Sequence, residues 1–169
     1  MGQPKKVISK RVILACVEYS AASVPALSSA ADLVRSDPNA ELHIVHVVSP
    51  PYPTMHRDGR TPDRLEAFNM IGLDAQNELP WLYSQNISDL GPRVTGHLCL
   101  GRPDREIVLL AAKIRADLIV IGTHGRTTLE RVFLGSVAER VLRAASCTVL
   151  TVRPKERTRE PPCAGAHLR

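Results

Sequence analysis

Aromatic side chains are scarce in this chain, at 4% of its 169 residues. Proteins that hold single-stranded nucleic acid without sequence preference stack the bases on aromatic rings, so this composition argues against such a platform. The net charge of +5 permits contact with phosphates, but it does not distinguish a nucleotide from nucleic acid. Part of that charge lies in the two basic tails, and we favour solvated tails over DNA binding.

The four cysteines have no CxxC spacing and no accompanying histidine cluster, which are the patterns that a zinc site or a redox pair requires. Three of them, Cys16, Cys99 and Cys147, lie in or beside apolar runs, and Cys163 lies in the C-terminal tail. We therefore expect small core residues and free thiols. Free thiols are typical of reducing compartments, so the expected location is cytoplasmic.

Long apolar runs are also missing. No stretch reaches the roughly 18 residues that a transmembrane helix needs. The apolar residues after Lys5 and Lys6 are interrupted by Ser9, Lys10 and Arg11, which is not the pattern of a signal peptide. We expect no membrane partner.

Two common nucleotide motifs are absent from the sequence. There is no GxxxxGK[ST], the phosphate-binding P-loop, and no GxGxxG after the first apolar run, the dinucleotide fingerprint. The first apolar run instead leads into CVEYSAAS, at residues 16–23. Nucleotide binding, if present, needs another arrangement.

Five short apolar runs predict five strands. They are rich in β-branched residues and nearly continuous in hydrophobicity, as in strands that are buried on both faces. The predicted strands are RVILACV (11–17), ELHIVHVV (41–48), VTGHLCL (94–100), DLIVIG (117–122) and CTVLTVR (147–153).

Segments with helical periodicity separate these strands. Residues 104–116 place Ile107, Leu110, Ala111 and Ile114 on one apolar stripe. Three further helices are expected at 20–36, 62–84 and 136–146, of which 62–84 is interrupted by glycine and proline.

Two of these helices carry start signals. Ser20 or Ser23 can cap the first, and Pro25 fits the Ser23 start because proline is tolerated in the first turn. Ser136 and Glu139 match a capping box at the start of the last helix.

Strands that alternate with helices predict an α/β fold, a single-domain doubly wound sheet of five parallel strands. We expect the folded domain over 8–154, a flexible tail over 1–7 and a disordered tail over 155–169. The Pro-rich segment 49–62 is expected to be a long loop.

The stretch GTHGRTTLERVFLGS, residues 122–136, follows the fourth predicted strand. In open α/β sheets, ligands bind beyond the carboxyl ends of the strands. Glycines there let backbone amides approach an anion, and a helix that begins at Ser136 adds free amides and a partial positive charge. The stretch therefore indicates a phosphate site.

Other interpretations of the same residues stay open. Gly122 and Gly125 can serve a tight turn, Gly135 a helix entry and Ser136 a plain helix cap. Arg126 can clamp a phosphate or face solvent. We do not assign His124 a general-base role, since loop histidines commonly bond backbone groups. His43 and His46 lie three residues apart on one strand, on opposite faces, and are a poor metal pair.

The spacing Gly-x2-Gly-x9-Gly-Ser resembles the nucleotide-binding signature of the universal stress protein family. Four further segments are similar to that family: VILACVEYSAAS, LHIVHVV, LGRPDREIVLLAAKIRADLIVIGTHGR and CTVLTVRP. The resemblance covers about residues 8–154 and is most specific over 101–154.

The resemblance implies a five-stranded, four-helix domain, similar to adenine-nucleotide hydrolases, that binds ATP with Mg²⁺ or Mn²⁺ between strands one and four. It implies phosphate contacts from the glycines and Ser136, and an adenine contact from the backbone of Val47. The family usually has aspartate where this chain has Glu18, which keeps the carboxylate and adds a methylene. The implied contact residues are Cys16, Val17, Glu18, Val47, Ile121, Gly122, Thr123, His124, Gly125, Arg126, Gly135, Ser136 and Val137.

Three functions are compatible with these features. The first is an ATP-binding stress-response protein with little or no turnover and no assigned catalytic residue. The second is a slow metal-dependent ATP hydrolase, and the third is a nucleotide-free dimeric scaffold. In each case the edge strand at 148–153 suggests a homodimer, which the resemblance also implies.

Overall fold

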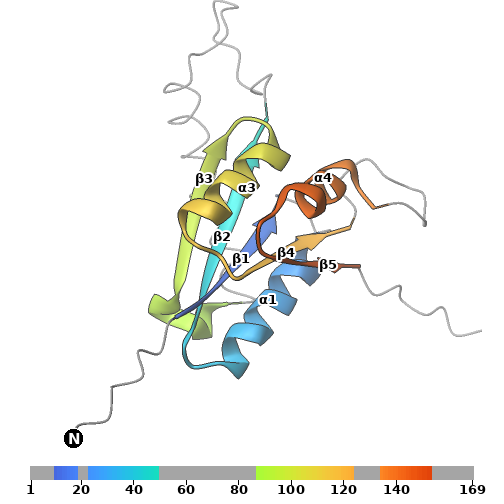
Figure 1. The fold of residues 1–169 in the computed structure, drawn as a ribbon. Helices are drawn as coiled ribbons and strands as arrows, with labels where there is room; N and C mark the ends of the chain where they lie inside the picture. The colour runs from blue at the N-terminus through green and yellow to red at the C-terminus, as the bar shows by residue number, and fades with distance from the viewer. Residues whose placement is uncertain (1–9, 19–22, 50–86, 124–133, 154–169) are drawn as a thin grey trace, which may run out of the picture.

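The computed structural model describes residues 10–18, 23–49, 87–123 and 134–153 (Figure 1). The predicted helix at 62–84 and the tails at 1–7 and 155–169 lie outside these ranges, as does the predicted loop at 49–62 except for Ser49. Residues 8, 9 and 154 of the predicted folded domain also lie outside them. The strands are β1 (Arg11–Val17), β2 (Ala40–Val48), β3 (Val94–Leu100), β4 (Leu118–Gly122) and β5 (Thr148–Val152). The helices are α1 (Val24–Ser36), the 3₁₀ segment η2 (Ser88–Arg93), α3 (Pro103–Lys113) and α4 (Ser136–Ala144).

The five strands form one parallel sheet in the order β3-β2-β1-β4-β5, so the predicted fold class is confirmed. β1 lies in the centre. From β1 the chain first builds outward through β2 and β3, and then returns to the other side of β1 through β4 and β5. The order therefore reverses between β1 and β4, which is where ligands bind in sheets of this kind.

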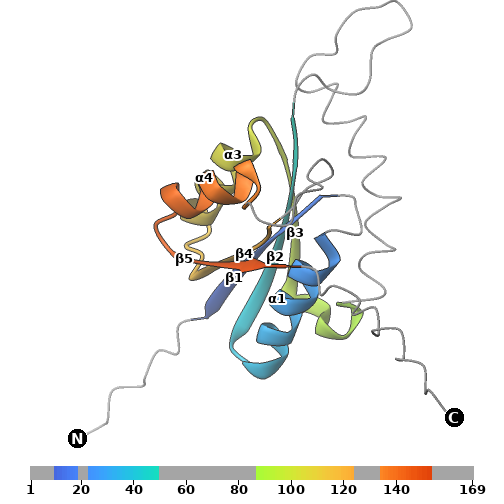
Figure 2. The ribbon, with the colours of Figure 1, turned by 90° about the vertical axis from the view of Figure 1, so that its right-hand side faces the viewer.

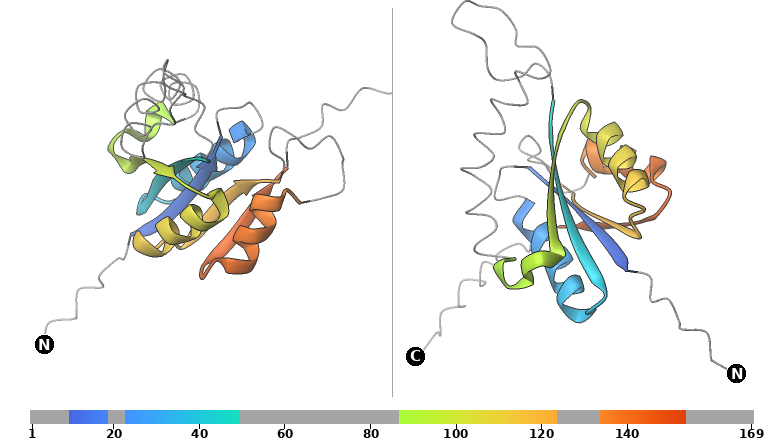
Figure 3. Two further views of the ribbon diagram at one scale, coloured as in Figure 1. Left: turned by 90° about the horizontal axis from the view of Figure 1, so that it is seen from above. Right: turned by 90° about the vertical axis from the view of Figure 1, so that its left-hand side faces the viewer.

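Helices cover both faces of the sheet. α1 packs on one face, and α3 and α4 pack on the other, as Figures 2 and 3 show from different sides. Side chains of β1 alternate between the two cores, with Ile13 and Ala15 facing α1 and Leu14 and Cys16 facing α3 and α4. Burial on both sides explains why this strand is a continuous apolar run.

Helix α3 carries the predicted stripe. Ile107, Leu110 and Ala111 are buried in the core beneath α3 and α4, and Ile114 packs against them. The helix ends three residues earlier than predicted, at Lys113.

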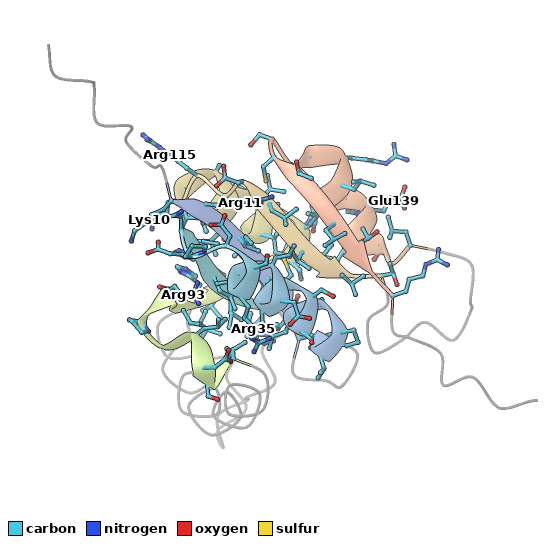
Figure 4. All side chains as sticks on the ribbon, turned by 90° about the horizontal axis from the view of Figure 1, so that it is seen from below. Lys10, Arg11, Arg35, Arg93, Arg115 and Glu139 are labelled. Atoms are coloured by element: carbon cyan, nitrogen blue, oxygen red, sulfur yellow. The ribbon has the colours of Figure 1, made fainter. Side chains whose placement is uncertain are left out.

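The end of α3 is a Schellman motif. The amide of Ala116 donates to the carbonyl of Ala111 at 2.8 Å, and the amide of Arg115 donates to that of Ala112 at 3.2 Å. Arg115 has a φ of 54°, a conformation that favours glycine. Its side chain lies beside the start of β1, at the edge of the sheet that Figure 4 views.

Two helix starts differ from the capping predictions. Ser23 is the N-cap of α1, as the Pro25 argument indicated, but its side chain makes no cap hydrogen bond. The capping box at Ser136 is wrong: Gly135 is the N-cap, Ser136 is the first helical residue, and within the described part of the chain the cap has no side-chain hydrogen bond. The carboxylate of Glu139 instead accepts a hydrogen bond from Arg143 at 3.0 Å.

The segment η2 was not predicted from the sequence. Two arginines connect it to the end of α1, and both are labelled in Figure 4. Arg35 donates to both carboxylate oxygens of Asp89, at 2.8 and 2.7 Å, and Arg93 donates to the carbonyl of Val34 at 2.9 Å. These contacts hold η2 against α1 just before β3 begins.

Candidate functional site

The carboxyl edge of the sheet aligns three of the implied contact residues. Val17 of β1 pairs with His46 of β2, so the next residue, Glu18, follows beside Val47. Cys16 pairs with Ile121 of β4, which is the last pair of that ladder. Val47 near the end of β2, Glu18 just after β1 and Thr123 just after β4 therefore all lie at the carboxyl edge of three neighbouring strands.

Two side chains hold the end of β1. His46 Nδ1 lies 3.0 Å from the carbonyl oxygen of Val17, and the hydroxyl of Ser23 donates to the carbonyl oxygen of Glu18. These two contacts hold the backbone at the carboxyl end of β1, where Glu18 follows the strand.

Thr123 joins three elements through its backbone. Its amide donates to the carbonyl of Val152 in β5 at 3.0 Å, and its carbonyl accepts from the amide of Gly135 at 2.7 Å. Thr123 itself is buried, at 3% exposure. This arrangement places the start of α4 beside the end of β4.

The amide of Gly135 is consequently engaged within the protein. The next three amides are different: within the ranges that the structure describes, those of Ser136, Val137 and Ala138 have no hydrogen-bond acceptor. The amide of Glu139 donates to the carbonyl of Gly135 at 2.9 Å and so begins the helical ladder. Three free donors and the positive end of the helix dipole therefore converge at one place, which suits an anion.

Apolar side chains flank this helix start. Cys16 and Ile121 are buried in the core beneath α3 and α4, and Val47 and Val137 pack against the same core. Burial raises the pKa of the Cys16 thiol far above its usual value, so this group stays protonated and is a poor nucleophile. Its side chain contributes a small apolar surface beside the helix start.

The remaining implied contact residues fall into two groups. Val17 is buried on the α1 face, and Gly122 ends β4. His124, Gly125 and Arg126 lie outside the described residues, so the glycine spacing is represented in the structure by Gly122 and Gly135 with Ser136.

No group of three or more His, Cys, Asp or Glu side chains capable of holding a metal ion occurs among the residues that the structure describes. Among those residues there is also no helix long and apolar enough to cross a membrane.

The prediction that His43 and His46 face opposite ways is confirmed, since His43 shares the face of Val45 and His46 that of Ile44. The sequence did not indicate that His43 has a histidine partner on the next strand. His43 Nδ1 and His97 Nε2 are 2.8 Å apart, and the ring planes differ by 12°.

The sheet order and the amide-lined edge define a doubly wound α/β protein with its candidate site at the β1–β4 switch point. The model of the universal stress protein family matches residues 10–153, and the chain belongs to this family.

Individual relatives agree with this assignment. The chain is 37% identical over 120 residues to a universal stress protein of Methanocaldococcus jannaschii, an alignment that covers 70% of this chain and 68% of the relative. A universal stress protein solved in complex with cAMP is 25% identical, with a TM-score of 0.61 over 85% of this chain and 97% of that one. The Archaeoglobus fulgidus universal stress protein in complex with dAMP is 26% identical, with a TM-score of 0.58 over 85% and 98% of the two chains.

Proposed function

We propose that this chain is an adenine-nucleotide-binding protein that holds ATP at the carboxyl edge between β1 and β4, with little or no turnover. The observation that carries the proposal is the set of three amides at the start of α4, at Ser136, Val137 and Ala138, that have no acceptor among the described residues. Two structural relatives were solved with cAMP and dAMP, which supports an adenine nucleotide as the ligand.

The donor set fits the phosphates of such a ligand. Backbone amides at a helix start bind phosphate oxygens, and the helix dipole contributes roughly half a positive charge. The apolar group of Cys16, Val47, Ile121 and Val137 lies next to that position and suits the uncharged part of a nucleotide. His124, Gly125 and Arg126 complete the proposed contact set by their place in the glycine spacing.

We propose that Mg²⁺ or Mn²⁺ accompanies the triphosphate. Mg²⁺ in nucleotide sites keeps several waters and binds through the phosphates rather than in a cage made only of protein ligands. The cation would neutralise part of the triphosphate charge, while the amides of α4 hold the phosphate oxygens.

Ligand-dependent stability tests this function. With ATP and Mg²⁺ at a hundredfold excess over Kd, the free energy of unfolding should rise by about 2.7 kcal/mol, and GTP at the same concentration should raise it less. Thermal or urea unfolding measures both effects. Mass spectrometry of small molecules released from freshly purified protein identifies any nucleotide that is retained. The absence of a shift with ATP, together with no released nucleotide, would refute the proposal.

A substitution at the helix start tests the amides directly. Proline is favoured at the first helical position, and Gly135, with φ −57° and ψ 147°, already has the conformation that precedes proline. Ser136→Pro therefore removes one amide and the hydroxyl at little cost to the helix. It should weaken ATP binding by about tenfold or more, the value of a hydrogen bond to a charged group. Ser136→Ala, which keeps the amide, is the matched control and should bind more tightly than Ser136→Pro.

We further propose that two copies associate through β5. This strand is an edge of the sheet, and Leu150 in it is 39% exposed. Exposed edges are usually paired or covered. Light scattering coupled to size exclusion should report a dimer for the native chain and a monomer for Leu150→Lys. Leu142→Lys, at a position 50% exposed on α4, is the control and should stay dimeric. A monomeric native chain would exclude this pairing.

The biological role that we propose is nucleotide-dependent partner binding in the cytoplasmic stress response. Family membership supports the stress-response part. Cys16 and Cys147 are free thiols among the described residues, which is usual in a reducing cytoplasm.

A further inference from the structure

A pair of histidines outside the candidate nucleotide site brings two metal-ligating groups together. Nδ1 of His43, on β2, and Nε2 of His97, on β3, are 2.8 Å apart. Neutral imidazole is the commonest metal ligand in proteins and suits zinc and its neighbours among the transition metals. Neither histidine belongs to the contact set proposed for the nucleotide, so the chemistry of the pair is independent of that site.

Strand register brings the two rings to one face of the sheet, next to its edge. His97 pairs with Val45 and His43 precedes Val45 by two residues, so both histidines share the face that α3 and α4 cover. β3 is the last strand of the sheet on this side. Both rings are half-buried, and Thr95, which pairs with His43, is exposed. Water and small ions can therefore reach the pair.

The separation of the two rings fits a tetrahedral ion. The centroids are 5.1 Å apart and the nitrogens 2.8 Å apart, and half of the difference, about 1.15 Å, is the distance from each ring centre to its nitrogen. Zinc–nitrogen bonds are about 2.0–2.1 Å long, so a zinc ion in line with both nitrogens lies about 3.2 Å from each ring centre. Two such distances span 5.1 Å at an angle of about 106°, close to the tetrahedral angle that zinc prefers.

Zinc binding requires the rings to turn but not to move apart. The nitrogens now face each other, and each ring must turn by about 35–40° to face a common zinc ion. Half-buried side chains have room for such a turn, and the torsion that carries the ring is broad in histidine. A right-angled site of the kind that Cu²⁺ and Ni²⁺ form would instead need ring centres about 4.5 Å apart. The observed spacing therefore favours zinc.

The protonation states of the pair also suit a metal ion. Desolvation lowers the pKa of both imidazoles, so both rings are neutral at pH 7, the form that binds metals. When zinc binds, the proton shared by the facing nitrogens moves to the far nitrogen of its own ring, and both rings stay neutral. The carboxylate of Glu41 raises the pKa of His43, and the ammonium of Lys113 lowers that of His97, so one acidic and one basic group act on the pair.

We propose that His43 and His97 form a zinc site that joins the edge strand β3 to β2, with water in the remaining coordination positions. Within the ranges that the structure describes, no group of three or more metal-ligating side chains occurs, so those ranges supply two ligands. Structural zinc sites have four protein ligands, whereas a site with open positions can bind a further small ligand. This site therefore holds its ion reversibly, and a hydrogen-bonded pair without such a role would bind no zinc.

Calorimetric titration with ZnCl₂ tests the site on the full chain, stripped of metal by a chelator and dialysed into chelator-free buffer at pH 7.5 without nucleotide. Zinc should bind, and MgCl₂ should not, because Mg²⁺ prefers oxygen ligands. His43→Gln and His97→Gln should each weaken zinc binding by about a hundredfold, since losing even the partner of a metal ligand costs about 10–100-fold. His46→Gln removes a histidine from the opposite face of β2 and is the matched control, which should bind zinc as the native chain does.

Two charge variants provide a second comparison. Lys113→Gln should tighten zinc binding and Glu41→Gln should weaken it, because each changes a charge near the pair without removing a ligand. A native chain that binds no zinc overturns the site, and so do glutamine variants of His43 and His97 that bind zinc as tightly as the native chain. Should either of these variants fail to fold, the charge variants decide, and an unchanged affinity in both of them overturns the site.

Discussion

Acidification should destabilise this protein through the His43–His97 pair. The ring centroids are 5.1 Å apart and the planes nearly parallel, while the facing nitrogens are 2.8 Å apart. The distance between the ring centroids is close to the distance between the two nitrogens plus the radius of each ring. The two rings therefore lie edge to edge and nearly in one plane. The nitrogens point at each other, so one must donate and the other accept. Two doubly protonated rings cannot make this bond.

The charges around the pair determine the sign of the effect. Desolvation lowers the pKa of both imidazoles; Glu41 opposes this at His43, whereas Lys113 adds to it at His97. Below pH 6.5, the usual pKa of histidine, the unfolded chain therefore binds more protons than the folded chain. Stability is fully present above that pH and is lost as the pH falls toward the lowered folded pKa values.

The size of this loss in stability follows from the proton that the folded state does not bind. Each pH unit below 6.5 costs at most about 1.4 kcal/mol per proton that the folded state does not bind. Both rings are only half-buried, and solvent screening reduces the effect, so we expect about 1 kcal/mol between pH 7.5 and 5.5.

Urea unfolding at the two pH values measures this loss. The double variant His43→Gln/His97→Gln cannot titrate but can still form a hydrogen bond between the strands, so it serves as the matched control. Between pH 7.5 and 5.5 the double variant should lose about 1 kcal/mol less stability than the native chain loses. An equal loss in the native chain and the double variant would show that the pair contributes nothing to acid sensitivity.

Three further substitutions test the backbone of the fold, each by urea unfolding. Arg115→Gly should raise the free energy of unfolding by about 0.5–1 kcal/mol, because glycine adopts the positive φ at the end of α3 without steric cost; a loss would contradict the Schellman argument. Gly91→Ala should lower it by about 1–2 kcal/mol through backbone strain alone, since a Cβ there meets no atom within 4 Å; an unchanged value would refute the strain. Asp117→Ala should cost about 1 kcal/mol by removing the acceptor of the Val12 amide at 2.8 Å, whereas Asp117→Asn, which keeps an oxygen acceptor, should cost less.

The strands were predictable because a parallel sheet imposes a strong signal. Ile13, Leu14 and Ala15 are all buried, at exposures of 1% or less, since helices cover both faces. Such a strand must be apolar at successive positions, and the sequence shows this directly. The stripe on α3 was predictable for the related reason that one helix face packs on the sheet.

The helix start at Ser136 was harder to predict because its determinant is not local. The pattern of Ser136 and Glu139 describes a capping box within four residues, but the hydrogen bond from Gly135 to Thr123 connects the helix to a strand. The sequence indicated that backbone amides at the carboxyl edge of the sheet are placed to bind an anion. Only the structure distinguishes the amide of Gly135, which is engaged, from those that follow it.

The two histidine contacts depend on strand register. His43 and His97 are 54 positions apart, and His46 and Val17 are 29 positions apart. Hydrophobic patterns locate strands but do not align one with another to the single residue. Ser23 illustrates a third limit, since its type and place predicted a cap while its hydroxyl serves the preceding strand.

The hydrogen bond between Thr123 and Gly135 brings the two ends of an intervening stretch of chain to within 2.7 Å of each other. The rest of the fold thus holds both anchor points, whatever residues connect them. Because the cost of closing a loop grows only slowly with its length, replacing that stretch by one of another length or composition should disturb the sheet little. We therefore expect the domain to keep its stability when that stretch is replaced, so that ligand choice at this edge can change separately from the fold.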